Sequence, residues 1–270
     1  MTSRQLNDRI LAGLPETDPA ERRAIARVLM EDLARVSRVD FAVNPDRELP
    51  DFLGPKVDAV LARLRAGEPL QYILGHAQFC GLDIEVTPDV LIPRPETAEL
   101  VDMIVDRHGS EPDLRVLDLA TGSGCIALAL GRALKFPRIT ALDLFPAALE
   151  VARRNGERLG VKVDWQLGDI RDLRLPGPWD IIVSNPPYVL DSERPTLAPQ
   201  VADHEPAMAL FTPDTDPLRF YTPTLDYARR VGAGAVYFEI NPLEASRFPG
   251  AEIVRDMSGH NRFAVYDPFR

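Results

Sequence analysis

The residues with the clearest chemical potential are Asn185, Pro186, Pro187 and Tyr188, which follow the apolar run 180–184. That run predicts a buried parallel strand, and two consecutive prolines must end it in a stiff, extended corner because they donate no backbone hydrogen bonds. The corner offers the side-chain oxygen of Asn185 and the carbonyl of Pro186 beside the ring of Tyr188. Two rigidly placed oxygens can accept both hydrogens of a planar NH2 group. The pattern therefore predicts binding of an amide or an exocyclic amine, although an ordinary turn after a core strand can carry the same four residues.

A second chemical cluster follows the apolar run 114–119, where Gly122 and Gly124 would let the backbone approach a ligand at the start of a helix. Asp143 ends the next predicted strand about 20 positions later, which is the spacing of a carboxylate that binds ribose hydroxyls. Together these residues predict a nucleotide-containing cofactor. The pattern Gly122-x-Gly124-x-x-Ala127 also matches the dinucleotide fingerprint, so a nicotinamide cofactor stays open at this point.

The elements that would position these residues alternate between strand and helix from residue 114 onward, which predicts an α/β fold with a doubly wound, mostly parallel sheet. Asp169 and Ile170 follow the third strand, where they could meet the edge and the face of an adenine. Residues 241–251 contain too many prolines for a full helix. We expect strands at 114–119, 138–144, 161–167, 180–184 and 235–240, a final strand pair at 251–256 and 262–267, and helices at 125–134, 146–159 and around 218–231.

The N-terminal part differs in character. Residues 1–75 predict a small helical domain, with one helix that starts at Asp18 and Pro19 and another that ends near Gly67. Residues 76–93 predict a linking β-hairpin, and residues 94–270 a catalytic domain. We interpret the arginines of the first helix as a solvated face rather than a binding patch.

Composition narrows the function classes. The net charge of −10 argues against a broad nucleic-acid-binding face, which needs an excess of basic residues. The two cysteines show no pairing pattern and the four histidines no ligand spacing, so we expect a reducing compartment and no metal. There is no signal peptide and no apolar run of membrane-spanning length, so we expect a cytoplasmic protein without membrane contact.

These motifs together resemble a known family. Their combination is similar to S-adenosylmethionine-dependent methyltransferases that act on planar nitrogens, and more closely to the bacterial peptide chain release factor glutamine N5-methyltransferases. The resemblance covers nearly the whole chain and implies a seven-stranded, Rossmann-like methyltransferase sheet. It is carried by residues 68–75, 87–97, 118–130, 184–188 and 204–210.

The resemblance also implies residue roles. The loop around Gly122 would wrap the methionine part of S-adenosylmethionine, Asp143 would hold the ribose, and Ile170 would lie against the adenine. The substrate would be the glutamine of the Gly-Gly-Gln loop of class 1 release factors. Residues 1–75 would recognise this partner, and we expect a monomer. The implied catalytic residues are Asn185, Pro186 and Tyr188. The implied substrate contacts are the same three residues together with Pro187. The implied cofactor contacts are Ala120, Thr121, Gly122, Ser123, Gly124, Asp143, Asp169, Ile170 and Asn185.

Two positions depart from the family pattern. Ala120 stands where the family has its first loop glycine, and Ile170 stands where related enzymes often carry an aromatic ring.

Three rival functions remain open. The first rival is a methyltransferase acting on an exocyclic amine of DNA or RNA, which would need a basic track. The second is a hydride-transferring enzyme, and the third is a non-catalytic module that keeps the fold without turnover.

Overall fold

The computed structural model describes residues 1–269 and divides into two compact units, Met1–Leu74 and the chain from Gly75 onward. Each unit has a hydrophobic core of its own. The N-terminal core gathers around Leu6, Leu29 and Val57, and a core of the second unit gathers around its central strands.

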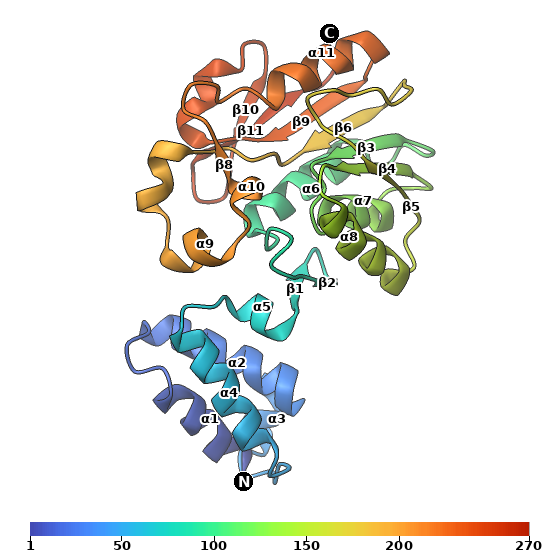
Figure 1. Cartoon of the computed structure of the whole chain (residues 1–270). Helices are drawn as coiled ribbons and strands as arrows, with labels where there is room; N and C mark the ends of the chain where they lie inside the picture. The colour runs from blue at the N-terminus through green and yellow to red at the C-terminus, as the bar shows by residue number, and fades with distance from the viewer. Residues whose placement is uncertain (270) are drawn as a thin grey trace. The chain divides into compact units, whose positions relative to one another are not determined.

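The N-terminal unit consists of short helices (Figure 1). The helix that we expected after Asp18 begins at Pro19, because the Asp18 side chain accepts the Ala20 and Glu21 backbone N–H groups. The first, third and fifth helices were missed, although Thr2 and Gln5 form a capping box that marks the start of the first. The helices are α1 Ser3–Ala12, α2 Pro19–Ala34, α3 Arg38–Val43, α4 Leu53–Arg65 and α5 Leu70–Leu74.

The second unit begins with the expected β-hairpin, which is shorter than the range 76–93. Strand β1 (His76–Phe79) pairs antiparallel with β2 (Leu82–Glu85). Val90 and Ile92, which we had included as strand residues, are buried in irregular backbone that leads into helix α6. Their apolar character reflects burial rather than strand pairing, and alternation alone does not separate the two.

The sheet confirms the predicted fold class. Seven strands lie in the order β10-β11-β9-β6-β3-β4-β5; β11 runs antiparallel to β9 and β10, and the other pairs are parallel. The segment 241–251 holds a short 3-10 helix, η2 (Pro242–Arg247), in place of a full helix. The strands are β3 Arg115–Leu119, β4 Arg138–Asp143, β5 Val163–Leu167, β6 Ile181–Ser184, β9 Ala235–Glu239, β10 Glu252–Arg255 and β11 Asn261–Tyr266, and a small pair is β7 Val189–Leu190 with β8 Phe211–Thr212.

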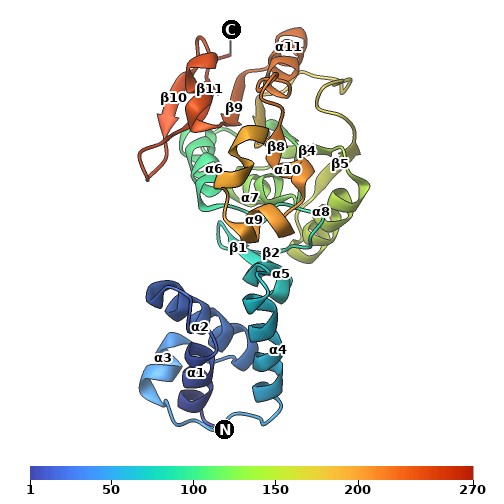
Figure 2. The same ribbon diagram turned by 60° about the vertical axis from the view of Figure 1, so that its left-hand side comes forward.

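Helices cover both faces of this sheet (Figures 1 and 2). Three of them, α6, α7 and α8, lie together on one face, and α11 lies on the other. Pro95 and Pro146 begin α6 and α8 as expected, because proline suits the first position of a helix. The helices of this unit are α6 Pro95–His108, α7 Cys125–Ala133, α8 Pro146–Leu159, α9 Pro199–His204, α10 Ala207–Leu210 and α11 Tyr221–Val231, with a 3-10 turn η1 at Asp191–Thr196.

The strand register brings the predicted functional segments to one level. In the parallel ladders, Leu119 lies opposite both Leu142 and Ser184, and Asp143 lies opposite Leu167. The Ser184 hydroxyl donates to the carbonyl of Leu119 over 2.7 Å, which ties β6 to β3 at their ends. The chain order reverses between β3 and β6, and such a switch point is where open α/β sheets bind ligands.

Candidate active site

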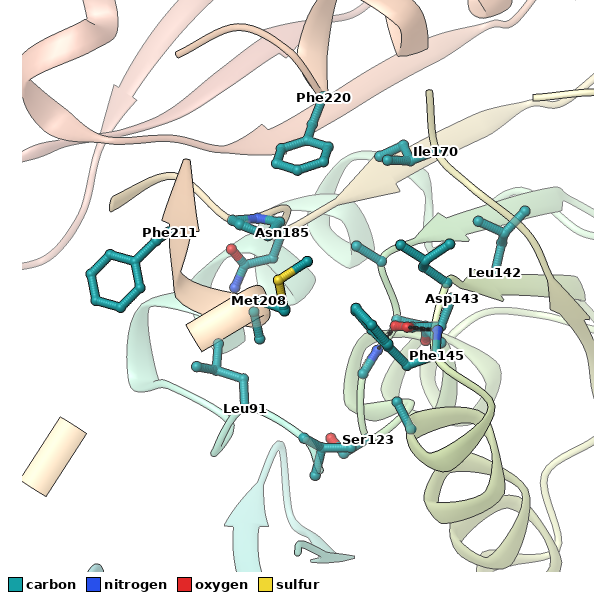
Figure 3. Close-up of a pocket in the computed structure, with 18 of the residues that line it drawn as sticks. Leu91, Ser123, Leu142, Asp143, Phe145, Ile170, Asn185, Met208, Phe211 and Phe220 are labelled. Atoms are coloured by element: carbon teal, nitrogen blue, oxygen red, sulfur yellow. Dashed lines mark hydrogen bonds between the residues drawn. The ribbon is translucent and has the colours of Figure 1, made fainter. Parts of the chain in front are cut away.

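A pocket of about 340 Å³ opens at the carboxyl ends of β3, β4, β5 and β6. Figure 3 shows Asn185 extending into it between two ends: Leu142, Asp143 and Phe145 lie at one, and Leu91, Met208 and Phe211 at the other. The volume lies within the range of small-molecule sites. Segments 89–97 and 207–220 complete its walls with residues far from the strands in sequence.

The loop after β3 is organised by the buried carboxylate of Asp118. Its Oδ2 accepts the Thr121 hydroxyl at 2.5 Å and the Ala127 backbone N–H at 3.1 Å, which joins the loop to the first turn of α7. Its Oδ1 is buried and has no partner among the described residues. Burial raises the pKa of Asp118 to about 7 because water no longer solvates the charge. An unpaired buried oxygen is costly, and Asp118 is not among the residues that line the pocket, so its carboxylate shapes the loop from behind.

Backbone conformation explains the small residues of the loop. Ala120 has φ of 57°, a left-handed conformation in which a side chain costs about 1–2 kcal/mol. The methyl group that departs from the family glycine therefore strains the backbone itself. Gly124 has φ of 81°, and a Cβ there would lie 2.9 Å from the Trp165 ring. Glycine is required at that position by packing as well as by conformation.

Asp143, at the end of β4, is positioned to accept hydrogen bonds. Its two oxygens accept backbone N–H groups, from Gly122 at 2.8 Å and from Phe145 at 3.0 Å. Burial raises the pKa of Asp143, whereas these bonds oppose the rise. Each carboxylate oxygen has a second lone pair, so two hydroxyl groups can still be accepted.

Beyond Asp143 the pocket wall is lined first by apolar side chains and then by charged ones. Ile170 is buried at the pocket surface, and Phe220 from the segment before α11 lies near it in Figure 3. The bonded Arg171 guanidinium lowers the pKa of Asp169. Phe220 supplies an aromatic ring at this end of the pocket, where the sequence offered only the aliphatic Ile170.

Asn185 is the polar group at the centre of the pocket. Its Nδ2 donates to the Thr97 hydroxyl over 3.1 Å, and Thr97 donates to the buried Glu239 over 2.7 Å. The Tyr188 hydroxyl donates to the other oxygen of Glu239 over 2.9 Å. Residues from three distant parts of the chain therefore converge behind the corner after β6.

The structure brings most of the expected site residues to one pocket. Three predicted site residues, Gly124, Pro186 and Tyr188, are not among the described residues that line the pocket. The contacts of the Pro186 carbonyl and of the Tyr188 ring with a substrate therefore stay predictions. The predicted residues that do line it are Ala120, Thr121, Gly122, Ser123, Asp143, Asp169, Ile170, Asn185 and Pro187.

Sequence reasoning missed several participants. Leu91, Met208 and Phe211 lay within or beside stretches that resembled the family, but their types carry no specific chemistry. Glu239 could have been found, because a carboxylate within an apolar strand is rarely buried without a purpose.

The donor set fits S-adenosylmethionine. Asp143 can accept ribose hydroxyls, and the glycine loop offers open space beside Gly122. Leu142 and Ile170 provide apolar surface for a purine. In residues 1–269, no three His, Cys, Asp or Glu side chains gather as a metal site would require.

Family models match both units of the chain. A PrmC N-terminal domain model matches residues 9–75, and a methyltransferase domain model matches residues 116–204. Together they span the helical unit and the part of the sheet that carries the pocket. The methyltransferase match favours methyl transfer, for which S-adenosylmethionine is the general donor, over hydride transfer.

Several curated relatives resemble the chain over most of its length. A release factor glutamine methyltransferase of Bacteroides thetaiotaomicron is 39% identical over 90% of this chain and 92% of its own. The protein of the same name from Flavobacterium psychrophilum is 35% identical over 91% of both chains. A third, from Staphylococcus aureus, is 32% identical over 89% of this chain and 91% of its own.

A solved structure shares the fold at low sequence identity. The catalytic domain of hMettl16, in complex with the MAT2A 3′UTR hairpin 6, has a TM-score of 0.50 and 16% identity over 70% of this chain and 77% of its own. No helix within residues 1–269 combines the length and the apolar composition needed to cross a membrane.

Proposed function

The chain belongs to the release factor glutamine methyltransferase family, and we propose that it methylates the glutamine N5 atom in the Gly-Gly-Gln motif of class 1 release factors with S-adenosylmethionine as donor. The observation that supports this most directly is the single pocket shared by Asp143, the glycine loop and Asn185. A ribose acceptor and an amide acceptor in one cavity suit methyl transfer to an amide.

On this proposal the cofactor end of the pocket binds and orients. The backbone of residues 120–124 holds the amino-acid part, Asp143 accepts the ribose hydroxyls, and Ile170 with Phe220 encloses the purine. S-adenosylmethionine, when bound, supplies a methyl group that its sulfonium makes electrophilic. The protein then has to place a nitrogen in line with that methyl group.

The substrate end supplies this placement. A carboxamide nitrogen is a weak nucleophile because its lone pair is delocalised into the carbonyl. Asn185 Oδ1 and the Pro186 carbonyl accept its two hydrogens, which orients the nitrogen and favours positive charge as it attacks. Orientation of this kind can contribute about 7–11 kcal/mol. No protein base is needed, since the methylated, positively charged amide nitrogen is acidic enough to lose its proton to water.

The decisive experiment is mass spectrometry of the Gly-Gly-Gln peptide of a class 1 release factor after incubation with the protein and S-adenosylmethionine. We expect a gain of one methyl group on the glutamine. Asn185→Ala should abolish the gain while calorimetry shows that cofactor binding persists, because Asn185 acts on the substrate amide. Equal turnover by the variant would refute the role of Asn185.

In a parallel experiment, the same enzyme is incubated with DNA or RNA and labelled cofactor. Methylation of a nucleic acid without methylation of the release factor would overturn the proposed substrate. We also propose that the active protein is a cytoplasmic monomer. Sedimentation of the active protein checks its oligomeric state.

A further inference from the structure

A chain of hydrogen bonds behind the pocket connects Asn185 to the buried carboxylate of Glu239. Asn185 Nδ2 donates to Thr97 Oγ1 (3.1 Å), and Thr97 Oγ1 donates to Glu239 Oε2 (2.7 Å). Thr97 is 2% exposed and Glu239 is 1% exposed, so water does not compete for these bonds. None of the three residues is adjacent in sequence to another, so only the fold assembles the chain.

The number of protons in this chain fixes the orientation of the Asn185 amide. A hydroxyl has one proton to donate, and an ionised carboxylate can only accept. Thr97 gives its proton to Glu239, so its oxygen can only accept from Asn185. The amide must therefore direct its NH2 group toward Thr97 and leave its carbonyl oxygen for the pocket.

We propose that Thr97 and Glu239 are positioning residues that lock the Asn185 amide with its oxygen toward the substrate nitrogen. This inference rests on the proposed function, in which Asn185 accepts a hydrogen from the glutamine amide. A rotated amide would present NH2 to NH2, and two donors cannot bond. Because the two ends of a carboxamide have nearly the same shape, packing alone selects poorly between the orientations, and the proton count of the chain selects between them.

The sheet register explains why Glu239 lies in reach. Ser184 of β6 is opposite Phe238 of β9, so Asn185 and Glu239 leave the ends of neighbouring strands at the same level. Thr97 stands in the first turn of α6, on the face of the sheet where that helix packs against β9. The positions are set by main-chain geometry rather than by flexible side chains.

The charge of Glu239 depends on its surroundings. Burial raises its pKa, and Glu96 adds to the rise, whereas the bonds from Thr97 and Tyr188 and the positive charge of Arg262 oppose it. The buried Tyr221 hydroxyl donates to its backbone carbonyl. When Glu239 takes up a proton it can donate to Thr97, and Thr97 can then donate to a rotated Asn185. Acidification should therefore release the lock.

The first test removes the hydroxyl of Thr97 without changing side-chain shape. Thr97→Val should lower kcat for the Gly-Gly-Gln glutamine on the order of 10- to 100-fold, by analogy with the loss of residues that orient metal ligands. The cofactor dissociation constant should stay at the wild-type value, and Thr97→Ser, which keeps the hydroxyl, should restore kcat. The matched control is Thr140→Val, which removes a partly buried threonine hydroxyl from β4 outside the chain of bonds.

A second test needs no substrate. The side-chain NH2 of Asn185, assigned by its absence from the NMR spectrum of Asn185→Asp, should exchange slowly in the wild type because it is bonded to Thr97. The same signal should shift and exchange faster in Thr97→Val and in Glu239→Gln. This readout separates the two proposals: a wild type that methylates no release factor refutes the proposed substrate, whereas an unchanged NH2 signal refutes the lock.

The pH profile gives the last readout. Wild-type kcat should fall toward acid pH as Glu239 takes up its proton, and Thr97→Val should lack that fall because its lock is already broken. Loss of kcat in Thr97→Val that Thr97→Ser does not restore, or an acid limb that persists in Thr97→Val, would overturn the inference. If Thr97→Val does not fold, the NMR signal and pH profile of Glu239→Gln decide in the same way.

Discussion

At the scale of single residues, the site holds groups that cost stability. Asp118 keeps an unpaired oxygen in the interior, and Ala120 holds a left-handed backbone that glycine adopts more readily. Strain of this kind persists at functional sites because the surrounding structure enforces it. Asp118 lies near the end of β3, and Ala120 lies in the following loop, which we assign to the cofactor.

The Asp118 cost leads to a prediction about stability and pH. Its pKa is about 7 in the folded protein against 3.8 in the unfolded chain. Between these values the folded state keeps a proton that the unfolded state releases, so the contribution of Asp118 to stability falls as pH rises toward 7 and stays low above it. Asp118→Asn cannot ionise. Its unfolding free energy relative to wild type should therefore rise by about 2–3 kcal/mol between pH 5 and pH 8.

Urea unfolding without cofactor at the two pH values measures this difference. Asp106→Asn, which changes an exposed aspartate on α6, is the control and should follow wild type at both. A difference between Asp118→Asn and wild type that does not vary with pH would show that Asp118 is charged in the folded protein throughout.

At the scale of elements, one buried side chain joins the hairpin to the cofactor loop. Asn155 of α8 is fully buried; its Oδ1 accepts the Glu85 backbone N–H, and its Nδ2 donates to the carbonyls of Glu85 and Ser123. A side chain that satisfies three backbone groups of two segments fixes their separation. The loop around Gly122 therefore depends on a side chain of α8 that does not itself line the pocket.

Asn155→Ala should leave those three backbone groups unsatisfied and lower the unfolding free energy by about 2–4 kcal/mol. It should also weaken cofactor binding, since the Ser123 carbonyl loses its anchor. Urea unfolding and calorimetric titration with S-adenosylmethionine measure the two effects. Arg153→Ala, on the same helix at a half-exposed position, should alter neither. Normal cofactor affinity in a destabilised Asn155→Ala would show that the loop holds its shape alone.

At the scale of the whole molecule, the pocket and the helical unit are separable. Every residue that lines the pocket lies between Asp89 and Phe220, and residues 1–74 close a hydrophobic core of their own. The separation fits the hypothesis that the helical unit recognises the partner protein while the second unit does the chemistry. It also allows the two contributions to be measured apart.

Removal of residues 1–74 should leave the cofactor dissociation constant unchanged, because the cofactor contacts remain. On an intact release factor, kcat/KM should fall by about 10-fold or more, as the loss of about 1.4 kcal/mol or more of partner contact implies. On a short Gly-Gly-Gln peptide it should not change. Steady-state kinetics on both substrates make the comparison, and an equal loss on the two would contradict a role in partner recognition.

Local sequence was sufficient for the framework. Alternating apolar runs determined the parallel sheet. Proline determined where α6 and α8 begin, glycine determined where α8 ends, and the paired prolines determined the corner after β6. Each of these depends on backbone geometry within a few residues. The candidate ligands Asp143 and Asn185 could be named for the same reason, since each directly ends a strand or follows one.

Tertiary structure alone decided which groups support these ligands. Phe220 lines the pocket near Ile170, and Thr97 and Glu239 reach Asn185, across long separations in sequence. These contacts follow from strand order and register, which place the ends of β6 and β9 side by side. No local sequence pattern encodes that pairing. The sequence by itself determined the chemistry that the chain could offer, and the packing of the sheet determined in which orientation Asn185 offers it.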